Sequence, residues 1–146
     1  MEHYGTLLHA VCAYINGWED AAARFIPESG DGGLPGDPVV GKRLPYGTVA
    51  ALKEKAVRHM YVDGTCRLEL PFAVILRVDG NAPDKCMAAL DWFGQLTRHL
   101  EAFMPEGASR YSRCRLTDIP ARERITADGT AVYRAAYVIE MRTSGT

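Results

Sequence analysis

The sequence of 146 residues lacks several features that would assign it to a protein class directly. It has no apolar run of about 18 residues, so no membrane-spanning helix is predicted. Its 17 basic and 18 acidic side chains give a formal net charge of −1. That balance does not favour a polyanion as the main partner. The first residues carry no basic stretch ahead of an apolar one, so we expect no secretory signal.

Motifs that carry chemistry are also missing. No two of the four cysteines stand as Cys-x-x-Cys, which leaves a structural zinc site without support. There is no Gly-x-Ser-x-Gly, and no two histidines flank an acid at the spacing of a zinc protease. The stretch GDPVVGKR has Arg43 where a phosphate-binding loop needs a hydroxyl. We therefore expect no catalytic residue, no cofactor and no metal.

The cysteines are better explained by packing. Without a secretory signal, reduced thiols are expected. Cys12 and Cys86 fall on apolar helical faces, and Cys66 falls on the apolar face of a strand. We predict that they are buried as small hydrophobic side chains.

Two Asp-Gly corners are the clearest positive signal. Asp-Gly between two apolar runs is a strong indicator of a β-hairpin, and it occurs at 63–64 and 128–129. The first corner requires a strand over at least 56–62. After it, alternate residues from Cys66 to Leu76 are apolar, which predicts a strand that ends buried on both sides. Pro71 interrupts that strand and suggests an edge or a bulge.

The second corner follows 121–127 and precedes alternating apolar residues from Tyr133 to Met141, which predicts another hairpin. A short strand is expected over 110–119.

Two helices are predicted from apolar residues at helical spacing. The first covers 4–16 and ends at Asn16-Gly17, and 18–26 is expected to add a turn or two. The second covers 82–104, with Asn81 as its cap and Pro83 in its first turn. Its apolar stripe comprises Cys86, Ala89, Leu90, Phe93, Leu96, Leu100, Phe103 and Met104.

Two segments are harder to interpret. Helix propensity favours a helix for VAALKEKA within 48–61, although the hairpin needs a strand at the end of that segment. Residues 27–47 are rich in glycine and proline and are predicted to be a flexible loop. The whole chain, 1–146, is expected to form one α+β domain. Its antiparallel or mixed sheet is built from the two Asp-Gly hairpins and flanked by an N-terminal and a long central helix.

The order of these elements resembles a known family. A Tyr-x-Asp-Gly turn is followed by LPFAVILR, then by ALDWFGQLTRHLE, and finally by IPARERITADGTAVYRAAYVIEMR. In this order the motifs, which span about 57–142, resemble the tail terminator (minor capsid) proteins of siphophage-type bacteriophages and prophages.

The resemblance implies a structural protein of the virion tail, made in the cytoplasm of the bacterial host. Its subunits would close into a ring, typically a hexamer, on the end of the tail tube. Its partners would be other copies of itself, the tail tube protein and the head-completion or connector protein. DNA would pass through the lumen without sequence-specific contacts.

Candidate interface residues come from the mixed-charge stretches and the first hairpin. They are Lys42, Arg43, Tyr46, Arg58, Tyr61, Arg122 and Arg124. Two alternatives remain open. One is a head–tail joining or neck protein of the same virion, and the other is a small enzyme or ligand-binding domain that uses the thiols.

Overall fold

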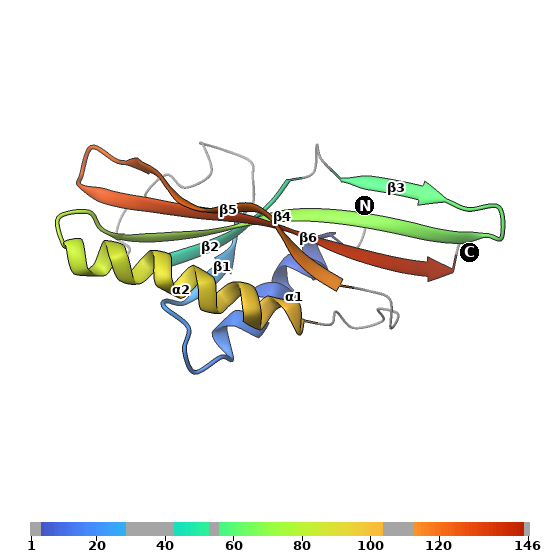
Figure 1. The fold of residues 1–146 in the computed structure, drawn as a ribbon, viewed down its shortest axis with the longest axis horizontal. Coiled ribbons are helices and arrows are strands. Elements are labelled where there is room, and N and C mark those ends of the chain that lie inside the picture. Colours follow the sequence, from blue (N-terminus) through green and yellow to red (C-terminus); the bar gives the residue numbers. More distant parts are fainter. Residues whose placement is uncertain (1–3, 29–42, 53–55, 104–112, 145–146) are drawn as a thin grey trace.

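The computed structural model describes residues 4–28, 43–52, 56–103 and 113–144. These residues form two helices and a mixed six-stranded sheet, so the α+β prediction is confirmed. The elements follow one another as α1 Tyr4–Asn16, β1 Phe25–Pro27, β2 Tyr46–Ala51, β3 Val57–Met60, β4 Thr65–Asp79, α2 Pro83–Glu101, β5 Arg113–Ile125 and β6 Thr130–Ser144 (Figure 1).

The sheet is organised around two long central strands. Its order is β1-β2-β4-β6-β5, and β3 pairs with β4 beyond the end of β2. Strands β4 and β6 pair antiparallel over 15 residues each, from Thr65 opposite Ser144 to Asp79 opposite Thr130. Only the short β1–β2 pair is parallel among the described strands. Both helices cover one face of this sheet (Figure 1).

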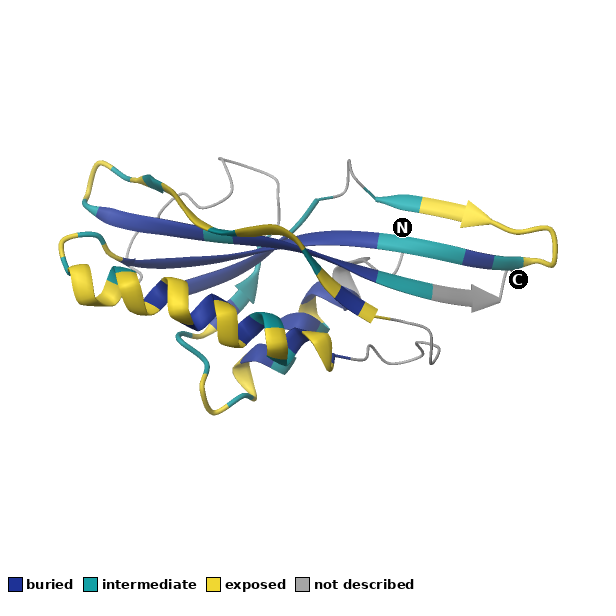
Figure 2. Cartoon of the chain, in the orientation of Figure 1, coloured by how far each residue is buried: buried dark blue, intermediate teal, exposed yellow. Residues whose placement is uncertain are grey.

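The main core lies between the helices and that face. It takes alternate residues of the strands, such as Phe72 and Val74 of β4 and Tyr137 of β6. The opposite face has a smaller buried cluster, made of Ala50, Ala73, Ile75 and Val132. The centre of β4 is therefore buried on both sides, as its sequence predicts, and Figure 2 shows this buried centre in dark blue.

Both predicted hairpins are present. Strands β3 and β4 meet at Asp63-Gly64, and β5 and β6 meet at Asp128-Gly129. Each glycine has a positive φ, +87° at Gly64 and +88° at Gly129, which explains why glycine follows the aspartate.

Pro71 lies in a central strand although proline has no amide hydrogen to donate. It occupies a position where no neighbouring strand needs that hydrogen bond. The carbonyl oxygen of Pro71 accepts from the amide of Leu52, so this side of Pro71 faces the gap between β2 and β3. Strand β2 pairs with β4 up to Phe72, and β3 pairs with it from Glu69. The sequence suggests an edge or a bulge at Pro71. The structure instead has at this position the point where β4 changes its partner from β3 to β2.

The first helix is confirmed with its predicted bounds, but the helical turns expected over 18–26 are wrong. Phe25 instead begins strand β1. The Asn16 side chain fixes this reversal, because its amide donates to the carbonyl of Phe25 at 2.8 Å and its oxygen accepts from the Phe25 amide at 2.7 Å. Gly47 makes room for the Phe25 ring, since a Cβ there would lie 2.4 Å from it.

The second helix is also confirmed, but it ends at Glu101 rather than at 104, and it differs at its start and on its surface. The N-cap is Ala82 rather than Asn81, and no side chain caps the helix. Leu90 is exposed, whereas Trp92 is buried and stacks on Phe25 with ring centroids 5.5 Å apart. Met104 lies outside the described residues.

The helix favoured by propensity at the start of 48–61 is wrong. Residues Tyr46–Ala51 form strand β2, because pairing with β4 and burial on both faces outweigh helix propensity. Most of the predicted loop 27–47 lies outside the described residues, but its ends are ordered in β1 and β2. The two segments expected over 110–119 and 121–127 form one strand, β5, from residue 113 to residue 125, whose pairing with β6 shifts register three times, and residues 110–112 lie outside the described part of the chain.

Candidate assembly surfaces

One end of the sheet projects beyond the helices as an arm, defined here as residues 57–69. It comprises β3, the turn 61–64 and the first residues of β4, and the last residues of β6 pair with β4 alongside it (Figure 1). In Figure 2 most of β3 and the turn are exposed. The tip of the arm, Met60–Val62, is apolar although it faces solvent, with exposed fractions of 62% for Met60, 39% for Tyr61 and 109% for Val62.

The second hairpin has the same turn with different side chains. In the arm, the amide of Tyr61 donates to the carbonyl of Thr65 at 2.9 Å, and Asp63 accepts from the Thr65 amide at 3.0 Å. In the second hairpin the amide of Thr126 donates to the carbonyl of Thr130 at 2.8 Å, and Asp128 accepts from the Thr130 amide at 3.2 Å.

These two turns align residue by residue along the chain. Thr126 and Ala127 occupy the positions that Tyr61 and Val62 occupy in the arm. The backbone of this turn therefore does not require apolar side chains at its first two positions.

An ion-pair cluster lies where the arm joins the rest of the sheet, on the face away from the helices. Glu140 of β6 accepts from Nε of Arg115 at 2.8 Å and from Nε of Arg113 at 3.1 Å. Arg67 pairs with Glu69 and lies 3.8 Å from Glu140. Burial alone would raise the pKa of Glu140, but the hydrogen bonds from Arg115 and Arg113 outweigh it and lower the pKa.

A groove of about 810 Å³ opens at the opposite end of the sheet, between α2 and the start of β2. Its buried apolar floor includes Leu76, Val78, Ala89 and Trp92. Its rim has charges of both signs, namely Arg43, Lys85, Asp79 and Asp91. Since β4 begins in the arm and ends beside the groove, the two features lie at opposite ends of one strand.

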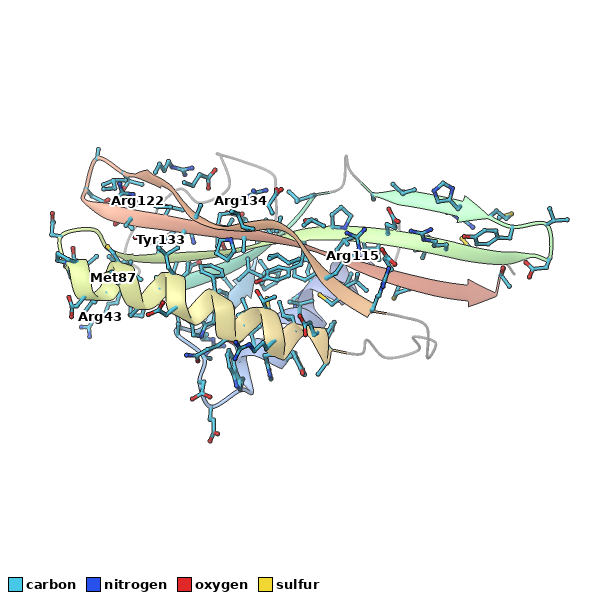
Figure 3. All side chains as sticks on the ribbon, in the orientation of Figure 1. Arg43, Met87, Arg115, Arg122, Tyr133 and Arg134 are labelled. Carbon is cyan, nitrogen blue, oxygen red and sulfur yellow. The ribbon has the colours of Figure 1, made fainter. Side chains whose placement is uncertain are left out.

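The sequence-predicted interface residues separate into two groups. Arg58 and Tyr61 belong to the arm, where Nε of Arg58 donates to Sγ of Cys66 at 3.4 Å. Arg122 and Arg124 lie on β5 near the second hairpin, and Arg124 lies 3.7 Å from Glu123. Figure 3 shows Arg43 and Arg122 toward the same end of the molecule, whereas Arg115 lies toward the arm.

The two remaining candidates differ from expectation. Tyr46 is buried on β2 beneath the guanidinium of Arg77, whose Cζ lies 5.2 Å from the centre of its ring, so Tyr46 offers little surface to a partner. Lys42 lies outside the described residues.

Sequence reasoning missed the buried Arg77. Its side chain is 1% exposed, donates to the Thr48 hydroxyl at 3.2 Å and lies 3.8 Å from the Glu28 carboxylate. The signal available in the sequence is an arginine that follows the apolar stretch 70–76 and precedes Val78, because a buried charge needs a partner. These contacts fix β2 and the residue after β1 to the centre of the sheet.

The cysteine side chains pack against other residues, and most of them are buried. Cys12, Cys66 and Cys114 are buried and Cys86 is half-buried. Burial raises the pKa of Cys12 and of Cys114 to about 12, so both thiols stay protonated at neutral pH. Within the described ranges, no three His, Cys, Asp or Glu side chains are grouped to hold a metal ion. No helix in this part of the chain is long and apolar enough to cross a membrane.

No protein-family model matches the chain, and no curated protein matches it.

Proposed function

We propose that this chain is a ring-forming subunit that caps the tail tube of a siphophage-type bacteriophage and joins it to the head-side connector. The observation that carries the proposal is the presence of two unlike surface features, the exposed apolar arm tip and the groove, at opposite ends of one strand. Contacts between unlike surfaces on identical subunits generate rings when the rotation closes. The order of motifs over 57–142 supplies the family resemblance.

The position of the polar and thiol groups is consistent with a structural role. The arginines and carboxylates on the face away from the helices pair with each other, as in the cluster around Glu140 and in the contact of 3.7 Å between Arg134 and Asp118. The high pKa values of Cys12 and Cys114 do not favour thiol catalysis by these two residues.

The proposed partners are other copies of the chain, the tail tube protein and a connector protein. Four arginines on β5 (Arg113, Arg115, Arg122 and Arg124) are the groups we would place nearest to DNA passing through the ring. Glu140 neutralises part of this charge, so only weak and sequence-independent contact is expected.

The experiment is binding of the purified chain to purified tail tubes, followed by electron microscopy of the tube ends. A ring of density at one end, together with arrest of further tube polymerisation, is the expected result. Binding to portal-bearing heads but not to tubes would replace this proposal with a head–tail joining protein. Binding to neither would overturn both.

A further inference from the structure

We infer that the arm tip of one subunit docks into the groove of the next subunit, and that this contact closes the ring. The inference rests on the proposed function, because it names the surfaces that join neighbouring copies.

The first argument is that the tip carries apolar side chains that the turn does not need. The two Asp-Gly turns share their backbone hydrogen bonds, yet Val62 is fully exposed where the second turn has Ala127. The fully exposed side chain of Val62 contributes little to the fold of the monomer, whereas a cluster of exposed apolar side chains is typical of a contact surface.

The second argument is complementarity of shape and charge between tip and groove. The tip is an exposed apolar turn at the end of a projecting hairpin, and the groove is a hollow with an apolar floor. Arg58 and Asp63 bracket the tip, while Asp79, Asp91, Arg43 and Lys85 form the rim. Either charge on the arm can therefore meet an opposite charge on the rim.

The third argument identifies the occupant as a second copy. Both surfaces belong to the same chain, and β4 holds them at opposite ends, so the tip of a subunit lies far from its own groove. A contact between copies satisfies both surfaces at once and leaves a free tip and a free groove on each pair for the next subunit.

The test is a disulfide trap between two differently substituted chains, with Cys86→Ser in both to remove the half-buried native thiol. One chain carries Val62→Cys and the other carries Ala88→Cys, which lies in the groove. The matched control replaces Ala88→Cys by Met87→Cys. Met87 is the preceding, exposed residue of α2 and does not line the groove.

The V62C and A88C chains are expected to cross-link about tenfold faster than V62C and M87C chains, both free at high concentration and on tail tubes, because docking raises the effective concentration of the two thiols. Equal rates for both pairs would overturn the inference. Faster cross-linking of V62C with itself would also overturn it, since that result would indicate a tip-to-tip contact.

A second variant removes the apolar side chains of the tip. Y61T/V62A gives the arm the first two turn residues of the second hairpin, so the turn should still form, although the hydrogen bond between Tyr61 and Arg67 is lost, and self-association should be abolished. A88E should block the groove in the same way, whereas M87E should not. If A88E and Y61T/V62A both cap tubes as wild type does, this inference fails while the proposed function stands. If wild-type protein forms no cap, the proposed function itself fails.

Discussion

The amide of Gly80 donates a hydrogen bond to the carbonyl oxygen of Gly129 at 2.9 Å. This contact joins the turn that leads into α2 to the turn of the second hairpin, two segments that lie far apart in the sequence. It is one of the places where the central helix is fixed relative to the sheet, and it leaves no space for a side chain at Gly80.

Gly80→Ala is expected to destabilise the protein. A Cβ at this position would lie 2.6 Å from the carbonyl oxygen of Gly129, which is backbone and cannot move aside easily. We expect a loss of about 1 to 3 kcal/mol in the free energy of unfolding. Chemical denaturation measures this loss, and an unchanged midpoint would contradict the close approach.

Gly94→Ala is the matched change, and it is expected to stabilise the protein. Gly94 lies inside α2, and a Cβ there would meet nothing within 4 Å. Alanine loses less backbone freedom than glycine when a helix forms, so a gain of about 0.5 to 1 kcal/mol is expected. Destabilisation by this variant in the same denaturation experiment would show that α2 packs differently around Gly94.

Glu140→Gln should destabilise the protein in a pH-dependent way. The carboxylate accepts hydrogen bonds from two arginines, and its pKa is lowered in the folded chain. The stabilisation from this group is therefore present above the unfolded-state pKa of about 4.3 and is lost as the pH falls through the lower folded-state pKa.

At pH 7 we expect Glu140→Gln to cost about 1 kcal/mol, since both arginines are largely exposed to solvent. The difference from wild type should shrink in acid. Glu123→Gln is the control and should change stability little, because the Glu123 side chain is more exposed than that of Glu140 and pairs with one arginine, Arg124, at 3.7 Å. A cost for Glu140→Gln that stays constant down to pH 3 would exclude an ionic origin.

The imidazole of His99 should stabilise the protein through stacking rather than through its polar atoms. Its ring lies between Tyr14, at 4.2 Å, and Trp18, at 4.3 Å, and so joins the α1 region to α2. Within the described residues its buried Nε2 has no hydrogen-bond partner.

His99→Ala is therefore expected to cost about 1 to 3 kcal/mol, whereas His99→Phe should keep most of the stability. Thermal unfolding of the two variants distinguishes these roles, with His59→Ala on the exposed strand β3 as a control. A Phe variant as unstable as the Ala variant would point to a polar contact of His99.

Thiol labelling should follow burial. With a disulfide reagent at neutral pH, we expect Cys86 to react first, because it is half-buried while the other three are buried. Cys12 and Cys114 should react only on the timescale of unfolding, since their raised pKa values leave almost no thiolate. Fast labelling of either one in the native protein would instead support the alternative that the chain is a small enzyme or ligand-binding domain that uses its thiols.

Much of the fold could be predicted because it depends on short-range patterns. Helix α1 follows from one apolar stripe and an Asn-Gly stop, and each hairpin follows from an Asp-Gly corner. The errors came where a distant partner decides the conformation. Strand β2 forms in a segment of good helix propensity because β4, more than twenty residues later in the chain, supplies its hydrogen bonds.

The candidate surfaces were predictable only in part. Tyr61 and Arg58 were singled out from the sequence and lie in the arm, but Tyr46 proved to be buried beneath Arg77. The groove could not be foreseen, because its lining comes from four separate parts of the chain. Likewise, nothing in the local pattern of α2 indicates that Trp92 is covered by Phe25 while Leu90 stays exposed.

The sequence by itself determined where the chain turns and which residues of each strand share a face, since both depend on neighbours a few positions away. Tertiary structure alone decided which strands pair beyond the two hairpins, what each face packs against, and that an apolar tip and an apolar groove lie at opposite ends of β4. Those outcomes depend on burial and hydrogen bonding between segments distant in the chain, which no local pattern encodes.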